Sequence, residues 1–278
     1  MTEFLDVDGG RIAYDVTGAG PLAVLSHGMG DTRTAYRFLV PRLVAAGHRV
    51  ATADLRGLGE SSVGFPAYSR TETAEDLLAL VRHLGGPAVI VGHSYSGGSA
   101  TIAAAREPGL VTAIVELDPF TRPQKIDLGG LLRNGYHRKG IRLLFSAGML
   151  GSTNVMARYL DHAYPGVKPV DWDQQLAGMR SNLTEPGRMK VLQTMGNSDL
   201  KESGAALSRV RCPALIAVGA LDPDWADPEA EADGIAAAMP DGVATVKVIE
   251  GAGHYPHVQY PDRVAELILS FLKEHGRA

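Results

Sequence analysis

The sequence has very little cysteine and no excess of positive charge. Cys212 is the single cysteine among 278 residues, so no disulfide can form within the chain, and cysteine usage gives no argument for an oxidising compartment. Lys and Arg number 27 against 31 Asp and Glu, a net charge of −4. Because nucleic-acid binding requires clustered basic residues, we expect no nucleic-acid partner.

Long apolar runs are absent as well. No stretch of about 18 residues is free of charges and of glycine or proline breaks, so the sequence predicts no transmembrane helix and no membrane partner. The N-terminus carries Glu3 and Asp6 where a secretory signal needs a basic start and then an apolar segment. A cytoplasmic location is therefore expected. The hydrophobic share of 45% is that of a globular protein with a sizeable core.

Short runs of Val, Ile and Leu alternate with longer amphipathic stretches. This alternation is typical of an α/β fold with a mostly parallel central sheet flanked by helices. Predicted strands are Leu22–Ser26, Arg49–Ala53, Ala88–Val91, Ala113–Leu117, Ala214–Val218 and Thr245–Ile249, after an N-terminal hairpin of Glu3–Val7 and Arg11–Val16. Predicted helices are Tyr36–Ala46, Thr73–Leu84, Ser96–Arg106, Pro228–Ala238 and Asp262–Glu274.

Residues 121–207 break this alternation, because they lack β-branched runs and are rich in Leu, Met, Arg and Gly. We interpret them as a helical cap inserted between two parts of the core, residues 1–120 and 208–278. The insertion follows a strand, which puts it over the strand ends where open α/β sheets bind ligands. The alternative is a helical subdomain with no role in binding.

The clearest local pattern surrounds Ser94. The apolar strand Ala88–Val91 runs directly into Gly92, and small residues flank the serine before a helix begins. A serine at such a strand-to-helix turn adopts a strained backbone, exposes its hydroxyl, and faces the positive end of the helix dipole. The usual pattern is G-x-S-x-G, and here Ser96 occupies the last glycine position. Ser94 is the predicted nucleophile.

A serine nucleophile needs a base and an acid that orients the base. His254 follows the last predicted strand within a glycine-rich loop and is the predicted base, with His257 as the fallback. Asp222 lies just past the strand Ala214–Val218 and is the predicted acid, while Asp224 and Asp118 stay open as replacements. The chain order Ser94, Asp222, His254 is that of the α/β-hydrolases.

On these residues the sequence resembles the α/β-hydrolase superfamily, in its capped, esterase-like serine hydrolase branch. Two further segments carry the resemblance, Ser26-His27-Gly28-Met29-Gly30 and the D-x-R-G-x-G-x-S pattern of residues 54–61. The resemblance implies that the backbone N–H groups of Met29 and Tyr95 form an oxyanion hole. It also implies that His27, His93 and Arg56 brace loops instead of transferring protons.

A serine at this turn favours attack on an acyl carbon, whereas relatives that open epoxides or remove halides use aspartate. We therefore expect cleavage of a small, largely hydrophobic carboxylic ester, thioester or lactone through an acyl-enzyme. The alternatives are a cofactor-free perhydrolase with haloperoxidase-like activity, a C–C bond hydrolase, and a hydrolase-like ligand receptor with little turnover.

No cofactor and no metal are expected, because Gly-rich segments lack nucleotide-binding spacing and no metal-ligand motif surrounds His254. The expected partner is a small-molecule substrate, and a homodimer stays open. Apolar residues of the insertion and one near Asp222 are candidates for substrate binding: Phe145, Met149, Tyr159, Trp172 and Trp225, with Leu150, Met156, Leu160, Tyr164 and Met179 as further candidates.

Overall fold

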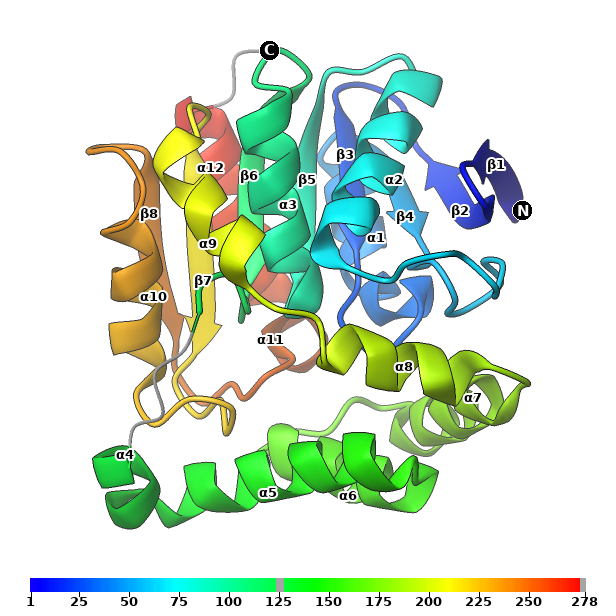
Figure 1. Ribbon diagram of the computed structural model, residues 1–278. Coiled ribbons are helices and arrows are strands. Elements are labelled where there is room, and N and C mark those ends of the chain that lie inside the picture. Colours follow the sequence, from blue (N-terminus) through cyan, green and yellow to red (C-terminus); the bar gives the residue numbers. More distant parts are fainter. Residues whose placement is uncertain (124–127, 276–278) are drawn as a thin grey trace.

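The computed structural model describes residues 1–123 and 128–275. The strands among these residues form one eight-stranded sheet (Figure 1). Its spatial order is β1-β2-β4-β3-β5-β6-β7-β8. β1 pairs antiparallel with β2, and β2 pairs antiparallel with β4. All other neighbouring strands in this order pair in parallel. The strands are β1 Glu3–Val7, β2 Gly10–Thr17, β3 Leu22–Ser26, β4 Arg49–Ala53, β5 Ala88–His93, β6 Val111–Leu117, β7 Ala214–Gly219 and β8 Ala244–Ile249.

Helices cover both faces of the sheet, which explains why β3, β5 and β7 are buried along their whole length. One face packs against α2 (Arg70–His83), α3 (Tyr95–Arg106), α9 (Lys201–Ala206) and α10 (Pro228–Ala236). The other face packs against α1 (Leu39–Ala45) and α12 (Pro261–His275). The short helix α11 (Pro256–Gln259) precedes α12.

The helices of the insertion lie together beyond the carboxyl ends of the parallel strands, at the bottom of Figure 1. They are α4 Leu128–Arg133, α5 Gly135–Leu150, α6 Thr153–Ala163, α7 Trp172–Thr184 and α8 Arg188–Gly196. A third apolar cluster joins them to the core around Leu55, Leu58 and Tyr95. Residues 124–127 of the predicted insertion lie outside the described residues.

The predicted fold, an α/β sheet with flanking helices, is confirmed. Every predicted strand is present and differs by three residues or fewer at either end. The predicted helix Tyr36–Ala46 begins later, at Leu39, because a short 3₁₀ turn at Arg33–Tyr36 precedes it. Helix α9, in the last part of the predicted insertion, packs with α3 on the sheet face. Among the described helices none has the length and apolarity needed to cross a membrane.

Candidate active site

Ser94 lies at the turn between β5 and α3 in a strained conformation, with φ 52° and ψ −114°. Three backbone hydrogen bonds hold it there. Its N–H donates to the carbonyl of Leu117 at 2.8 Å, and its carbonyl accepts from the N–H groups of Gly97 at 3.0 Å and Phe120 at 3.1 Å. The neighbouring strand and the loop after it therefore stabilise a backbone that serine alone would avoid.

Small residues allow β5 and α3 to meet tightly at this turn and the Gly28 loop to approach it closely. A Cβ atom on Gly92 would lie 2.3 Å from the Ser96 carbonyl oxygen, and one on Gly28 would lie 2.9 Å from Ser94 Cβ. Ser96, in the usual glycine position, is fully buried, and its hydroxyl donates to the His27 carbonyl at 2.6 Å. Ser96 thus ties the start of α3 to the loop that carries Gly28 and Met29.

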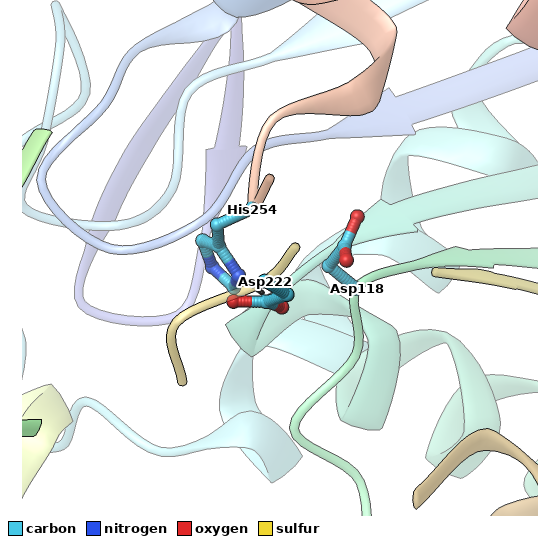
Figure 2. Close-up of side chains that lie close together, drawn as sticks. All are labelled: Asp118, Asp222 and His254. Atoms are coloured by element: carbon cyan, nitrogen blue, oxygen red, sulfur yellow. Dashed lines mark hydrogen bonds and ion pairs between the residues drawn. The ribbon is translucent and has the colours of Figure 1, made fainter. Parts of the chain in front are cut away.

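His254 and Asp222 face one another across the carboxyl ends of the strands (Figure 2). His254 Nδ1 lies 2.8 Å from Asp222 Oδ2, and both side chains are buried. Because a carboxylate accepts, Nδ1–H is the donor, which leaves Nε2 able to accept a proton. The other Asp222 oxygen accepts the Asp224 N–H at 2.9 Å.

Ser94 and His254 share their neighbours, although no hydrogen bond joins Ser94 Oγ to His254 Nε2. His93 donates from Nε2 to the His254 carbonyl at 2.7 Å, and the two rings are 5.0 Å apart. The Phe120 ring, whose N–H holds Ser94, meets the His254 ring edge to face at 6.0 Å. Bonds between a nucleophile and its base commonly tighten only with substrate present.

Two more carboxyl groups surround the His254 imidazole. Asp224 Oδ2 lies 3.5 Å from Nδ1 and accepts the Tyr159 hydroxyl at 2.6 Å. Asp118, with φ 45°, accepts the Gly219 N–H at 2.8 Å, and its other oxygen has no partner among the described residues. Burial raises the pKa of Asp224 to about 7 and that of Asp118 well above its usual range. Asp222, at 2.8 Å from Nδ1 against 3.5 Å for Asp224, holds the best position for the orienting acid.

The pKa of His254 reflects two opposing effects. Burial alone lowers it, but the nearby carboxylates of Asp222 and Asp224 stabilise the imidazolium and raise the pKa above its usual value. Loss of a nearby negative charge therefore lowers the pKa of His254, so that the imidazole is neutral at lower pH.

The two predicted oxyanion donors have unpaired N–H groups in the described part of the chain. Tyr95 is the first residue of α3 and has no acceptor in its own helix, and Met29 lies in the loop next to Gly28. Gly28 in turn contacts Ser94. Their participation in an oxyanion hole stays a prediction.

The other histidines of this region hold the loops in place. His27 donates from Nδ1 to the Gly28 carbonyl at 2.7 Å and accepts the Leu55 N–H at Nε2. His257, the fallback base, is fully buried between the rings of His93 and Tyr36, with both nitrogens unpaired in the described structure. Burial lowers its pKa to about 3. His257 is therefore neutral and has no partner acid.

A small cavity lies beside the Met29 loop, beneath α6 and α7. Of the apolar candidates from the sequence, it is lined by Met156, Leu160 and Met179, together with Met29, Gly30, Asp31, Gln175 and Tyr255.

The five named substrate-binding candidates are dispersed. Phe145 and Met149 are 66% and 65% exposed on the outer face of α5, so the structure does not place them in the cavity, against the prediction. Tyr159 is buried and bonds to Asp224, and Trp225 is buried against Phe120. Trp172 packs edge-on against Tyr164.

Asp118, Asp222 and His254 also offer three ligand atoms within 4.8 Å of one another, a set that could hold a metal ion. However, His254 Nδ1 and Asp222 Oδ2 are already bonded to each other, and the raised pKa of Asp118 favours its neutral form. To bind a metal ion, His254 and Asp222 would have to break their hydrogen bond, and Asp118 would have to lose its proton. The geometry thus fits a hydrogen-bonded acid and base better.

Two contacts between distant segments were not foreseen. The Ala163 carbonyl, at the end of α6, accepts the His254 N–H at 3.0 Å, and Tyr159 of the same helix bonds to Asp224. Asp31, which lines the cavity, was also not predicted from the sequence. Its position directly after the Gly28-Met29-Gly30 loop was the available signal.

Comparisons with known proteins identify the family of this chain. The sequence model of the alpha/beta hydrolase family matches residues 23–267. The chain is 27% identical to 2-(acetamidomethylene)succinate hydrolase of Mesorhizobium japonicum, over 96% of this chain and 94% of that protein. It is 28% identical to a probable esterase of Oryza sativa subsp. japonica, over 90% of both. An esterase structure from Thermogutta terrifontis covers 99% of both chains with a TM-score of 0.76 and 23% identity. The chain therefore belongs to the alpha/beta hydrolase family.

Proposed function

We propose that this protein is a serine hydrolase that cleaves a small, largely hydrophobic carboxylic ester, thioester or lactone. The observation that carries the proposal is the 2.8 Å contact between His254 Nδ1 and Asp222 Oδ2 beside a strained Ser94. The serine matters because a hydroxyl favours attack on an acyl carbon.

The reaction proceeds in two halves. His254 Nε2 takes the proton of Ser94 Oγ as this oxygen bonds to the carbonyl carbon, and the backbone N–H groups of Met29 and Tyr95 stabilise the oxyanion. The bond to the leaving oxygen or sulfur breaks, and the imidazolium donates its proton to that atom. A water molecule then attacks the acyl-enzyme with His254 as base, which releases the acid and restores Ser94.

The insertion is proposed to act as a cap over this centre. Its helices α6 and α7 line the cavity with methionine and leucine side chains, which favours a short apolar acyl or alcohol group. The relatives named as an esterase and a hydrolase support hydrolysis of this kind.

Turnover of p-nitrophenyl esters of graded chain length tests the proposal. We expect the protein to hydrolyse the short esters, and Ser94→Ala to remove about 10³-fold or more of kcat. Full activity in Ser94→Ala would overturn it. Peracid formation from acetate and peroxide, or ligand-induced thermal shifts without turnover, would instead favour a perhydrolase or a receptor.

A further inference from the structure

Asp31 places a carboxylate beside a cavity that is otherwise lined mainly by apolar groups. Its Oδ1 accepts the Thr32 N–H at 2.8 Å. Its other oxygen has no hydrogen-bond partner in the described part of the chain, and the residue is not fully buried. The free oxygen therefore belongs to a side chain that borders accessible space.

No positive group among the described residues pairs with Asp31. Arg37, which influences Asp31 electrostatically, donates to both carboxylate oxygens of Asp171 and to Gln175. His27 uses both ring nitrogens in other bonds. Burial raises the pKa of Asp31, and the nearby His27 and Arg37 side chains and the Thr32 N–H oppose this shift only in part.

A buried carboxylate oxygen without a hydrogen-bond donor is costly, and the position of Asp31 allows a substrate to supply that donor. Asp31 follows Met29, the predicted oxyanion donor, by two residues, so their Cα atoms are separated by at most about 7 Å. An acyl chain of about three atoms beyond the carbonyl carbon, with a hydrogen bond at each end, covers a separation of this order.

Resting on the proposed function, we propose that Asp31 is a specificity residue that selects short acyl groups carrying a hydrogen-bond donor, a hydroxyl or an ammonium. The carbonyl oxygen lies at the Met29 N–H, and the donor bonds to the free Asp31 oxygen. Met156 and Met179 pack against the methylene groups between them.

The test compares three p-nitrophenyl esters of equal length: butanoate, 3-hydroxypropanoate and 3-aminopropanoate. We expect the native protein to prefer the two donor-bearing esters in kcat/KM by about 10- to 100-fold, because bonds to a charged acceptor discriminate by this amount. Asp31→Leu should reverse the order. Asp31→Asn keeps the bond to Thr32 and should lose the ammonium preference alone. The same ratios in all three proteins would overturn the proposal.

A binding measurement separates this proposal from the proposed function. In Ser94→Ala protein, which retains the cavity, we expect the donor-bearing esters to raise Tm more than butanoate does. The difference should vanish in the double variant Ser94→Ala, Asp31→Leu. Equal shifts in both proteins would overturn the role of Asp31, whereas absence of turnover in the native protein with this difference retained would overturn only the hydrolase chemistry.

Discussion

Ser94 depends on the residues that touch it as much as on its own hydroxyl. Leu117, Gly97 and Phe120 hold its backbone at positive φ, and Gly28 leaves no room for a larger side chain. Strain of this kind persists only where the surroundings determine it. The chemistry of one serine therefore rests on contacts from three separate segments.

Gly28→Ala is predicted to impair both folding stability and activity. The new Cβ would lie 2.9 Å from Ser94 Cβ and 3.0 Å from His93 Nδ1, so the loop or the serine must shift, at a cost of about 1–3 kcal/mol. Urea unfolding and ester turnover measure the two effects. Gly178→Ala is the matched control, because nothing lies within 4 Å of its Cβ. Unchanged kcat in Gly28→Ala would contradict the close contact.

Asp224→Asn is predicted to shift the pH profile of kcat/KM. His254 must be neutral to accept the serine proton, so activity rises as pH increases through its pKa. The Asp224 carboxylate, 3.5 Å from Nδ1, helps to raise that pKa, and its removal lowers it. The acidic limb of the profile should therefore move to lower pH. An unmoved limb would show that Asp224 does not influence the base.

Helix α6 connects the insertion to the reacting residues at two points. The Ala163 carbonyl holds the His254 N–H, and the Tyr159 hydroxyl holds the Asp224 carboxyl. A Cβ atom on Gly253 would lie 2.2 Å from the Ala163 oxygen, so the loop and the helix end are in direct contact. This helix is part of the support for the acid and base.

Tyr159→Phe is predicted to move the pH profile in the same direction as Asp224→Asn. The Tyr159 hydrogen bond lowers the pKa of Asp224, so its loss keeps that carboxyl neutral to higher pH and weakens its effect on His254. The lost bond should also cost about 1–3 kcal/mol of stability. Tyr136→Phe is the control, because the Tyr136 hydroxyl also bonds to α6 but at the His162 carbonyl, and not to Asp224. Equal pH shifts in both variants would contradict a specific role for Tyr159.

At the scale of the whole molecule, the insertion contacts the core through α6, both at the Ala163 carbonyl and in the third apolar cluster. Amide hydrogen exchange tests this arrangement. The His254 N–H and the amides of α6 should exchange as slowly as those of α3, because opening requires loss of the Ala163 contact and of the apolar cluster around Met156 and Leu160. Much faster exchange in α6 than in α3 would indicate that this helix detaches from the core.

Much of this molecule could be predicted from the sequence. The apolar runs of β3, β5 and β7 predicted buried parallel strands because both of their faces are covered. The positions of Ser94, Asp222 and His254 at one edge of the sheet could be predicted because each follows a strand, whereas their catalytic roles stay a prediction.

The insertion could not be predicted to the same depth. Helix α5 carries apolar residues on both its inner and outer faces, so the sequence does not distinguish buried Leu143 from exposed Phe145. Contacts such as Tyr159 with Asp224 join residues 65 positions apart and leave no local pattern. Only the packing of the folded chain brings them together.

The most direct test of the central claim is the identity of the residue that attacks. The native protein is treated with a fluorophosphonate probe, digested, and examined by mass spectrometry. We predict a single phosphonylated residue, Ser94, with labelling slowed strongly in His254→Ala. Labelling confined to another residue, or none at all in folded native protein, would contradict Ser94 as the nucleophile.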